Sequence, residues 1–364
     1  MRRILLFVTA VLVWLGVAAA PASAHSVSGV SASNFHTHLT AVTPATPGID
    51  VKVVEAGSRL QLENRTGKEI IVLGYKEEPY LRIGPEGVFQ NKLSPATYIN
   101  VSRNGSEPPA AATNAKVGET DWEQISSEPL ARWHDHRIHW MLPTNPSEVR
   151  NSPGKRHVID PEWTVTMVVA RGTDPAGDRI AIKGDLVWQP GPSALPWYLL
   201  IAVLVALVVV ISRRPQWAQG LAAVTAVLVA VDIFHAVGLG LANAGGLSER
   251  LGKSITASPF AVLGWAAGAL AIVWLLRRRS DGLSAAALAG LLVALLGGVS
   301  DVGVLSHSEV PFGFGAGLAR LAVALSIGLG FGLAVAAALR LAGIGTPAPA
   351  EAAARSETLA ATAS

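Results

Sequence analysis

Residues 179–212 read RIAIKGDLVWQPGPSALPWYLLIAVLVALVVVIS, and this stretch joins two different kinds of sequence. Its first part, RIAIKGDLVWQ, alternates apolar and polar residues with the two-residue period of a β-strand. After the PGP turn signal the chain becomes almost wholly apolar up to Ser212, about long enough for a helix to cross the hydrocarbon of a bilayer. The sequence therefore predicts a β-rich domain joined to a membrane domain.

Residues 25–192 show no helical period, but they contain several short alternating runs bounded by Gly, Pro and Asn. This pattern predicts a β-sandwich of the immunoglobulin or cupredoxin type. Residues 102–129 are too polar for a strand and predict a long loop. The predicted strands are NFHTHLTAV, IDVKVVEAG, RLQLEN, EIIVLGY, YLRIG, WTVTMVVA and RIAIKGDLVWQ.

Residues 195–343 predict an all-α membrane domain with five transmembrane helices. Residues 344–364 are rich in Ala, Pro and Ser and predict a disordered cytoplasmic tail. The apolar stretches lie at about 197–212, 217–241, 258–276, 283–305 and 316–342.

Residues 1–24 have the features of a secretory signal peptide: Arg2 and Arg3, an apolar run, and small residues at Ala22 and Ala24. Cleavage after Ala24 makes His25 the mature N-terminus, whereas an uncleaved anchor is the alternative. Arginines follow the first and third apolar stretches, at 213–214 and 277–279. By the positive-inside rule, these positions predict a multi-pass protein of the cell membrane with its N-terminal domain outside the cytoplasm.

Charge and cysteine content exclude several classes of function. The net charge is +3, but residues 25–195 carry 17 Lys and Arg against 19 Asp and Glu. The excess of basic residues therefore flanks the apolar stretches, which predicts the lipid bilayer as a partner and no nucleic acid. The chain has no Cys, so any metal must be held by His, carboxylate, Met or backbone groups.

Histidines are concentrated in the exported part and suggest a metal site. A mature N-terminal His offers an amine and an imidazole to one ion, and copper(II) favours such nitrogen ligands. In a strand, the residues of each HxH pair lie on one face, so HTH and HDH each predict two converging imidazoles, and Met141 offers a thioether suited to copper(I). The predicted copper ligands are His25, His36, His38, His134, His136, His139 and Met141.

A structural interpretation of the same histidines stays open. They can form a structural or pH-responsive polar network, paired with carboxylates such as Asp135. The sequence does not decide between this network and a metal site.

Ionisable residues inside the apolar stretches predict a second site near the outer side of the membrane. Such groups are costly in lipid and usually face a partner or a polar cavity. Asp232 and His235 are three residues apart and share a helix face. A buried salt bridge from Arg320 to either aspartate is the structural alternative. The predicted membrane polar site comprises Asp232, His235, Asp301, His307 and Arg320.

Residues 80–101, YLRIGPEGVFQNKLSPATYINV, and 133–141, WHDHRIHWM, with the leader and five spans, resemble a group of uncharacterised actinobacterial membrane proteins. The layout is distantly similar to CopC/CopD-type copper proteins and to the B subunit of particulate methane monooxygenase. That resemblance implies His25 as a copper ligand and His134 with His136 as an HxH ligand pair. The sequence departs from it after His25, in HSVSGV, and five spans are fewer than the eight of CopD.

These observations predict a membrane-anchored, extracytoplasmic copper-binding protein that passes copper to its membrane domain. The alternative is a non-catalytic envelope protein whose sandwich recognises a protein partner and whose His-rich strand is structural. Oxidation at a histidine-brace copper is a third interpretation. No Ser-His-Asp order, paired catalytic glutamates or HExxH occurs, so we expect that the chain is not an enzyme.

Overall fold

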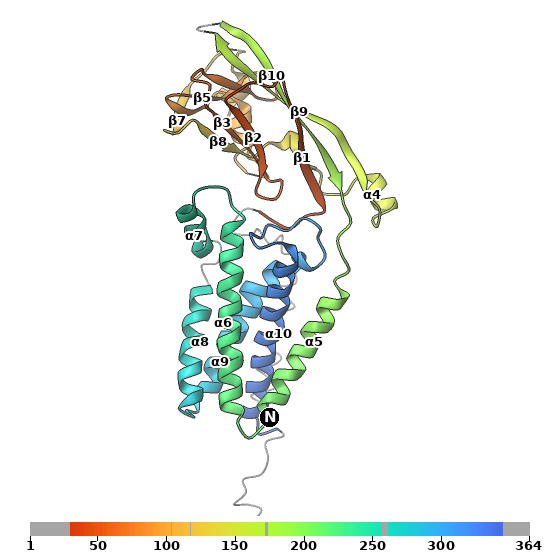
Figure 1. Ribbon diagram of the computed structural model, residues 1–364, viewed down its shortest axis with the longest axis vertical. Coiled ribbons are helices and arrows are strands. Elements are labelled where there is room, and N and C mark those ends of the chain that lie inside the picture. Colours follow the sequence, from red (N-terminus) through yellow and green to blue (C-terminus); the bar gives the residue numbers. More distant parts are fainter. Residues whose placement is uncertain (1–29, 103, 117, 172–173, 257–260, 345–364) are drawn as a thin grey trace, which may run out of the picture.

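The computed structural model describes residues 30–102, 104–116, 118–171, 174–256 and 261–344, with side chains 170–177 excepted. A β-rich part lies at one end of the molecule and a helical bundle at the other (Figure 1). The predicted leader, His25 and residues 345–364 of the predicted tail lie outside the described residues.

The β-rich part contains two antiparallel sheets, one of seven strands and one of three. The large sheet has the order β1 (Phe35–Thr43), β10 (Asp174–Trp188), β9 (His157–Arg171), β4 (Ile70–Leu73), β5 (Pro79–Gly84), β6 (Gly87–Asn91), β7 (Trp122–Ser126). The small sheet has the order β2 (Ile49–Val54), β3 (Arg59–Asn64), β8 (Leu130–Trp133).

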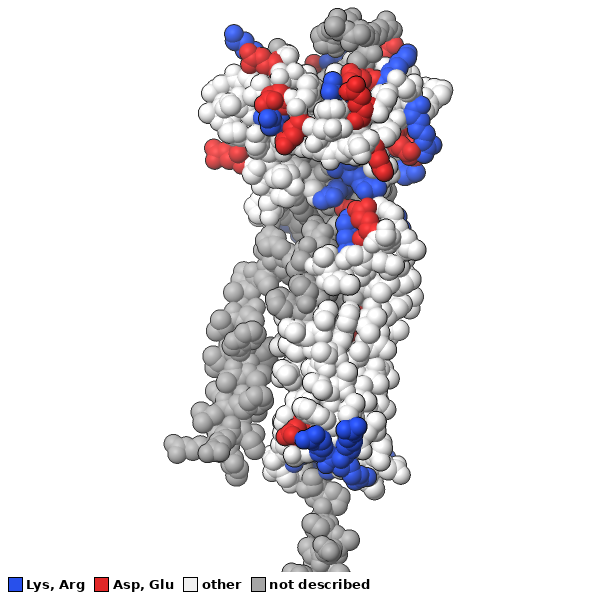
Figure 2. All heavy atoms as spheres, turned by 90° about the vertical axis from the view of Figure 1, so that its left-hand side faces the viewer, with Lys and Arg blue, Asp and Glu red and all other residues white. Residues whose placement is uncertain are grey.

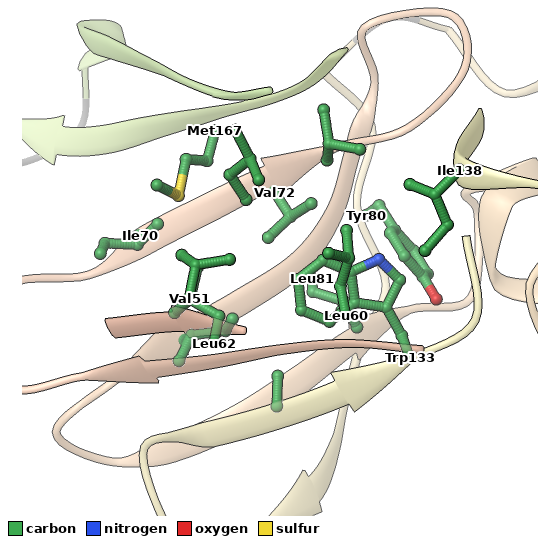
Figure 3. Packing of buried hydrophobic residues seen from close by; sticks show 14 of the residues in the cluster. Val51, Leu60, Leu62, Ile70, Val72, Tyr80, Leu81, Trp133, Ile138 and Met167 are labelled. Atoms are coloured by element: carbon green, nitrogen blue, oxygen red, sulfur yellow. The ribbon is translucent and has the colours of Figure 1, made fainter. Parts of the chain in front are cut away.

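Both sheets contribute to one hydrophobic core (Figure 3). Strand β3 alternates strictly, so that Leu60 and Leu62 are fully buried. Across the core, Ile70, Val72 and Met167 of the large sheet are fully buried as well. Burial of each such side chain contributes roughly 1.5–3 kcal/mol, so alternation is sufficient to fix which face of each strand points inward.

All seven predicted strand segments form strands, whereas β6 and β7 were not predicted, and the predicted His-rich strand continues only as far as Trp133, in β8. The predicted loop over residues 102–129 is wrong in part, because it contains β7 and the short helix α3 (Ala110–Asn114). Strand β7 reads WEQIS and has no buried residue. It is an edge strand held by main-chain bonds to β6, so it lacks the apolar alternation that identifies the others. Two further short helices are α2 (Pro95–Ile99) and α4 (Ser147–Asn151).

The helical part contains four helices long and apolar enough to cross a membrane, or five spans if α7 and α8 form one broken span. The axes of α7 and α8 differ by 74°. The fourth apolar stretch changes from α-helix to π-helix and then to 3-10 helix. The elements are α5 (Leu195–Ser212), α6 (Trp217–Leu241), α7 (Leu247–Thr256), α8 (Ala261–Leu276), α9 (Asp281–Leu292), a π-helix (Val293–Gly298), a 3-10 helix (Val299–Leu305) and α10 (Ala316–Leu341).

Helix α10 is the most enclosed of these helices, because glycines let its neighbours approach closely. Gly328 and Gly332, one turn apart, face α5, where an added Cβ would lie 2.8 Å from Leu204 and Val208 side chains. A Cβ at Gly330 would collide with the backbone of α9. Small residues at helix interfaces allow this close packing in membrane helices generally.

Candidate functional site

The turn between β2 and β3, residues 55–58, lies where the His-rich segment approaches the helical bundle. Glu55, Ala56 and Gly57 all have positive φ, at 56°, 50° and 81°. For the two residues with a Cβ this conformation is unfavourable, so surrounding contacts must hold the turn. Glu55 is 5% exposed, and its carboxylate accepts from the backbone N–H of Ala244, just beyond α6, at 3.3 Å.

His134 packs against this turn and uses both ring nitrogens. Its Nδ1 lies 2.9 Å from the carbonyl oxygen of Ser58, so Nδ1 carries the proton and donates. Its Nε2 lies 3.1 Å from Nε of Arg59, which can only donate, so Nε2 accepts. Burial, and secondly the charge of Arg59, lower the pKa of His134 below its ordinary 6.5. The contacts therefore specify a neutral imidazole.

Asp135 is the organising residue of the His-rich segment. It is fully buried and accepts two hydrogen bonds from the guanidinium of Arg137, at 2.8 and 2.7 Å. Its second carboxylate oxygen also accepts from the indole of Trp133 at 3.0 Å. Arg137 extends further and donates to the carbonyl oxygen of Leu73 in β4. The alternate residues of WHDHR thus form one buried polar unit that joins the two sheets.

The predicted convergence of His134 and His136 on one strand face is wrong. Strand β8 ends at Trp133, and Asp135 caps a 3-10 helix that begins at His136. This turn directs His136 to another partner, the carbonyl oxygen of Ser102 at 3.0 Å. The two histidines therefore contact different segments.

His139 and Met141 lie beyond this turn. His139 Nε2 is 3.1 Å from the carbonyl oxygen of Ser58, the atom that His134 also contacts. Met141 is 40% exposed at the surface. The 55–58 turn thus brings His134 and His139 to one carbonyl oxygen, that of Ser58. One ring nitrogen of each histidine donates a hydrogen bond to it.

His36 and His38 lie in β1 on one face, as their spacing predicts, with ring centroids 6.1 Å apart. Each nevertheless has a carboxylate partner. His36 Nδ1 lies 2.8 Å from Oε2 of Glu309, and His38 Nδ1 lies 2.7 Å from Oδ1 of Asp185. The predicted pairing with carboxylates therefore occurs, but the carboxylates are distant in sequence, and Asp135 pairs with Arg137 instead.

The described residues do not assemble a copper site. Within the described ranges, no group of three His, Asp or Glu side chains is arranged to hold a metal ion. An ion at His134 would have to displace Arg59 or the Ser58 carbonyl, and an ion at His36 would have to displace Glu309 or Ser308. His25, the predicted amine ligand, lies outside the described residues. Copper binding therefore stays a prediction.

Inside the bundle, Asp232 is 2% exposed and accepts a hydrogen bond from the indole of Trp265 at 2.7 Å. A Cβ at position 297 would collide with its other oxygen, so Gly297 of the π-helix is needed for close approach. The carboxylate thus lies between α6, α8 and the π-helix. A buried carboxylate beside an irregular helix is a common arrangement at functional sites in membranes.

His235 is on the same face of α6 and is also 2% exposed. Its Nε2 lies 3.5 Å from Oδ2 of Asp301, too far for a good hydrogen bond but within ion-pair range. Asp301 has non-helical φ and ψ of −108° and 16°, at the point where the fourth span changes direction. This arrangement can hold or share a proton, and it lacks a third close metal ligand among the described residues.

The alternative of a salt bridge from Arg320 to Asp232 or Asp301 is wrong. Arg320 donates instead to the carbonyl oxygens of Val304 and His307, at 3.2 and 2.8 Å. The 3-10 helix ends at Leu305, and its last carbonyls need donors, which a guanidinium on α10 supplies. His307 Nδ1 donates to the carbonyl oxygen of Gly303 at 2.6 Å. Arg320 and His307 therefore stabilise the end of this helix.

Sequence reasoning missed the junction between the β-rich part and the bundle. Ser33 and Glu309 form a two-way backbone bridge of 2.9 and 2.8 Å. The Asn34 side chain accepts from the backbone N–H of Ser308, and Ser308 Oγ donates to the carbonyl oxygen of Gln189. The sequence SHSE at 306–309 carried no periodic signal, so its contact with the β-rich part, through an isolated β-bridge, was not predicted.

Searches against protein-family models, curated proteins and solved structures found no match.

Asp135→Asn tests whether this carboxylate organises the His-rich segment. The change leaves the Arg137 charge without its buried partner, so we expect about 3 kcal/mol of destabilisation of the β-rich part. Thermal unfolding of the full chain in detergent, followed by near-UV circular dichroism, measures this. Asp50→Asn, which removes an exposed partner of Lys52, is the control and should unfold like the wild type. Equal unfolding of Asp135→Asn and wild type would contradict the assignment.

His134 should make stability depend on pH. Because its folded pKa lies below its unfolded value near 6.5, the unfolded chain binds the proton first as pH falls. Its stabilising contribution is therefore complete above about pH 6.5 and declines towards the lower folded pKa. We expect His134→Gln, an uncharged donor and acceptor, to reduce the fall in unfolding midpoint between pH 7.5 and 5. His157→Gln, at a histidine with a carbonyl partner elsewhere, should keep the wild-type fall.

Proposed function

We propose that this chain is a non-catalytic membrane protein of the cell envelope. Its β-rich part is an extracytoplasmic recognition domain, and its His-rich segment is structural. The observation that carries the proposal is the use of the histidine nitrogens: those of His36 and His134 are all engaged by protein groups. A carrier of copper needs lone pairs that are available to the ion, whereas these are already bonded to arginine, serine or carboxylate groups.

The membrane part holds the recognition domain in a fixed position in this proposal. Separate contacts join them, among them the Ser33–Glu309 bridge with its histidine, the Glu55–Ala244 hydrogen bond and the Arg132–Glu249 ion pair. A flexible tether would need none of these contacts. The attachments therefore support a domain that is presented at a set height and orientation above the bilayer.

We propose the β-sandwich class, of immunoglobulin or cupredoxin type, for the two sheets, and five spans for the bundle. The shared core of both sheets supports the first, and counting bent α7 and α8 as one span supports the second. Basic side chains gather at the end of the bundle remote from the β-rich part (Figure 2). With the leader-like residues 1–24, they support an orientation with the sandwich outside the cytoplasm.

Copper binding with delivery to the bundle is the competing function, and metal analysis separates the two. We expect full-length chain, purified with its leader processed, to hold well below one copper per molecule. His134→Ala with His136→Ala should lower the unfolding midpoint, because Arg59 and two carbonyl oxygens lose partners at about 1–3 kcal/mol each. His38→Ala, at a half-exposed ring, is the control. One copper per wild-type chain, lost in an otherwise stable double variant, would establish the competing function.

The orientation is testable with single cysteines, because the chain has none of its own. Ser127→Cys lies in the β-rich part and Ser280→Cys beside the arginines at 277–279, and both serines are exposed. We expect a membrane-impermeant maleimide to label Ser127→Cys on intact cells and Ser280→Cys only after permeabilisation. The reverse pattern would overturn the proposed orientation.

A further inference from the structure

A groove on the β-rich part borders about 600 Å³ of open space beside the small sheet. Its polar lining includes Arg59, Arg132, Gln90 and Asn100. Within the described part of the chain, none of its lining residues is a carboxylate. The groove therefore presents hydrogen-bond donors and positive charge, and the acids nearest to its two arginines, Glu55 and Glu249, lie outside its lining.

Arg59 is held so that its terminal nitrogens remain available. Its Nε is used by His134 at 3.1 Å and lies 3.4 Å from the buried carboxylate of Glu55. Among the described residues its hydrogen bond is made through Nε alone, and the side chain is 33% exposed. Neutral His134 thus fixes the Nε side of the Arg59 guanidinium. Its Nη side faces outward and can bind an anion in a bidentate manner.

Arg132 supplies a second guanidinium on the next strand, in β8. Its Nε donates to Gln61 at 2.8 Å, which fixes its direction, and its nearest carboxylate, Glu249, lies 3.8 Å away. Register places Arg132 opposite Gln61, two residues from Arg59 on β3. Asn100, 3% exposed in the groove wall, has a side-chain Nδ2 with no partner among the described residues. A ligand oxygen would satisfy a donor of this kind.

The position of α7 connects the groove to the membrane surface. Leu247, Leu251 and Ile255 recur every four residues along α7 and are 67%, 44% and 58% exposed. An amphipathic helix with such an apolar stripe lies in the interface between headgroups and acyl chains. Glu249, on the same helix, contacts Arg132. Figure 2 shows basic side chains at the base of the β-rich part, directly above this helix.

We propose that this groove binds a phosphate-type anion carried on an apolar body, with Arg59 and Arg132 as its anion ligands. The apolar rim, which includes Val101 and Ile125 at 63% and 53% exposed, would cover the adjoining part of the ligand. An anionic lipid of the outer leaflet and a soluble phosphate ester share this chemistry. The inference rests on the proposed function, since it names what the recognition domain recognises.

The test uses the full chain in nanodiscs of phosphatidylcholine. Octyl phosphate, below its micellar concentration, is titrated by calorimetry against wild type, Arg132→Gln, Arg59→Lys and Arg179→Gln. We expect wild type to bind, Arg132→Gln to bind at least about tenfold more weakly, and Arg59→Lys to bind several-fold more weakly because lysine keeps the charge but lacks the fork. Arg179→Gln, an equal charge change at an exposed pair with Glu77, should match wild type.

Each outcome is decisive. Absence of octyl phosphate binding by wild type, or equal weakening by Arg179→Gln, overturns the groove assignment. Arg59→Lys keeps a cation next to His134, so we expect its unfolding midpoint to match that of the wild type. Weaker binding of octyl phosphate by this variant then reports loss of a ligand contact and not misfolding. Nanodiscs containing phosphatidylglycerol should compete with octyl phosphate if the lipid is the source, and should leave its affinity unchanged if a soluble ester is. In one outcome the wild type fails to bind octyl phosphate, while the purified chain holds no copper and His134→Ala with His136→Ala is destabilised. That result would reject the anion ligand and leave the proposed recognition function intact.

Discussion

The buried ion pair between Asp135 and Arg137 is the constraint on which the His-rich segment depends. A fully buried carboxylate is tolerated only when its lone pairs are satisfied, and here Arg137 and Trp133 provide the donors. Because these residues alternate with the histidines, fixing them also fixes the direction in which His134 and His136 leave the chain. The pair ends β8, begins the 3-10 helix and ties the segment to β4 through Leu73. The directions of these two histidines are thus set by the ion pair beside them.

That segment in turn holds the strained turn at residues 55–58. Two non-glycine residues with positive φ would relax if the turn were free, but Ser58 contacts His134 and His139, while Glu55 contacts Arg59 and Ala244. The turn therefore has one side bonded to the β-rich part and the other to the bundle. Arg59, which follows it directly, is consequently presented at a fixed place in the groove. The turn and the proposed anion-binding edge of Arg59 are in this way held by contacts with one segment.

Much of the architecture could be predicted from the sequence, because burial of one face makes apolar residues recur at regular intervals along an element. Strands such as β3 alternate, and the membrane helices are uniformly apolar, so both were predicted. The edge strand β7 has a single neighbour and no buried face, and so it carried no such signal. The site was less readable. His134 finds Arg59 across 75 residues and His36 finds Glu309 across most of the chain, and no local pattern specifies such partners. One signal was available: an aspartate two residues before Arg137 is suited to cap a turn, which argues against a strand continuing through His136.

The same reasoning applies to the bundle, where the irregular helix and the buried acids explain each other. Asp232 has close neighbours inside the bundle, and Gly297 of the π-helix permits this approach because it has no Cβ. The following 3-10 turns bring Asp301 to His235 and leave carbonyl oxygens that Arg320 satisfies. Beyond them lie Ser308 and Glu309, which hold β1. Helix α6 carries Asp232 and His235 and is followed by Ala244, which holds Glu55. One path therefore runs from the polar cluster of the bundle through Ser308 and Glu309 to β1, and a second runs along α6 and through Ala244 to Glu55, which lies beside Arg59 of the groove.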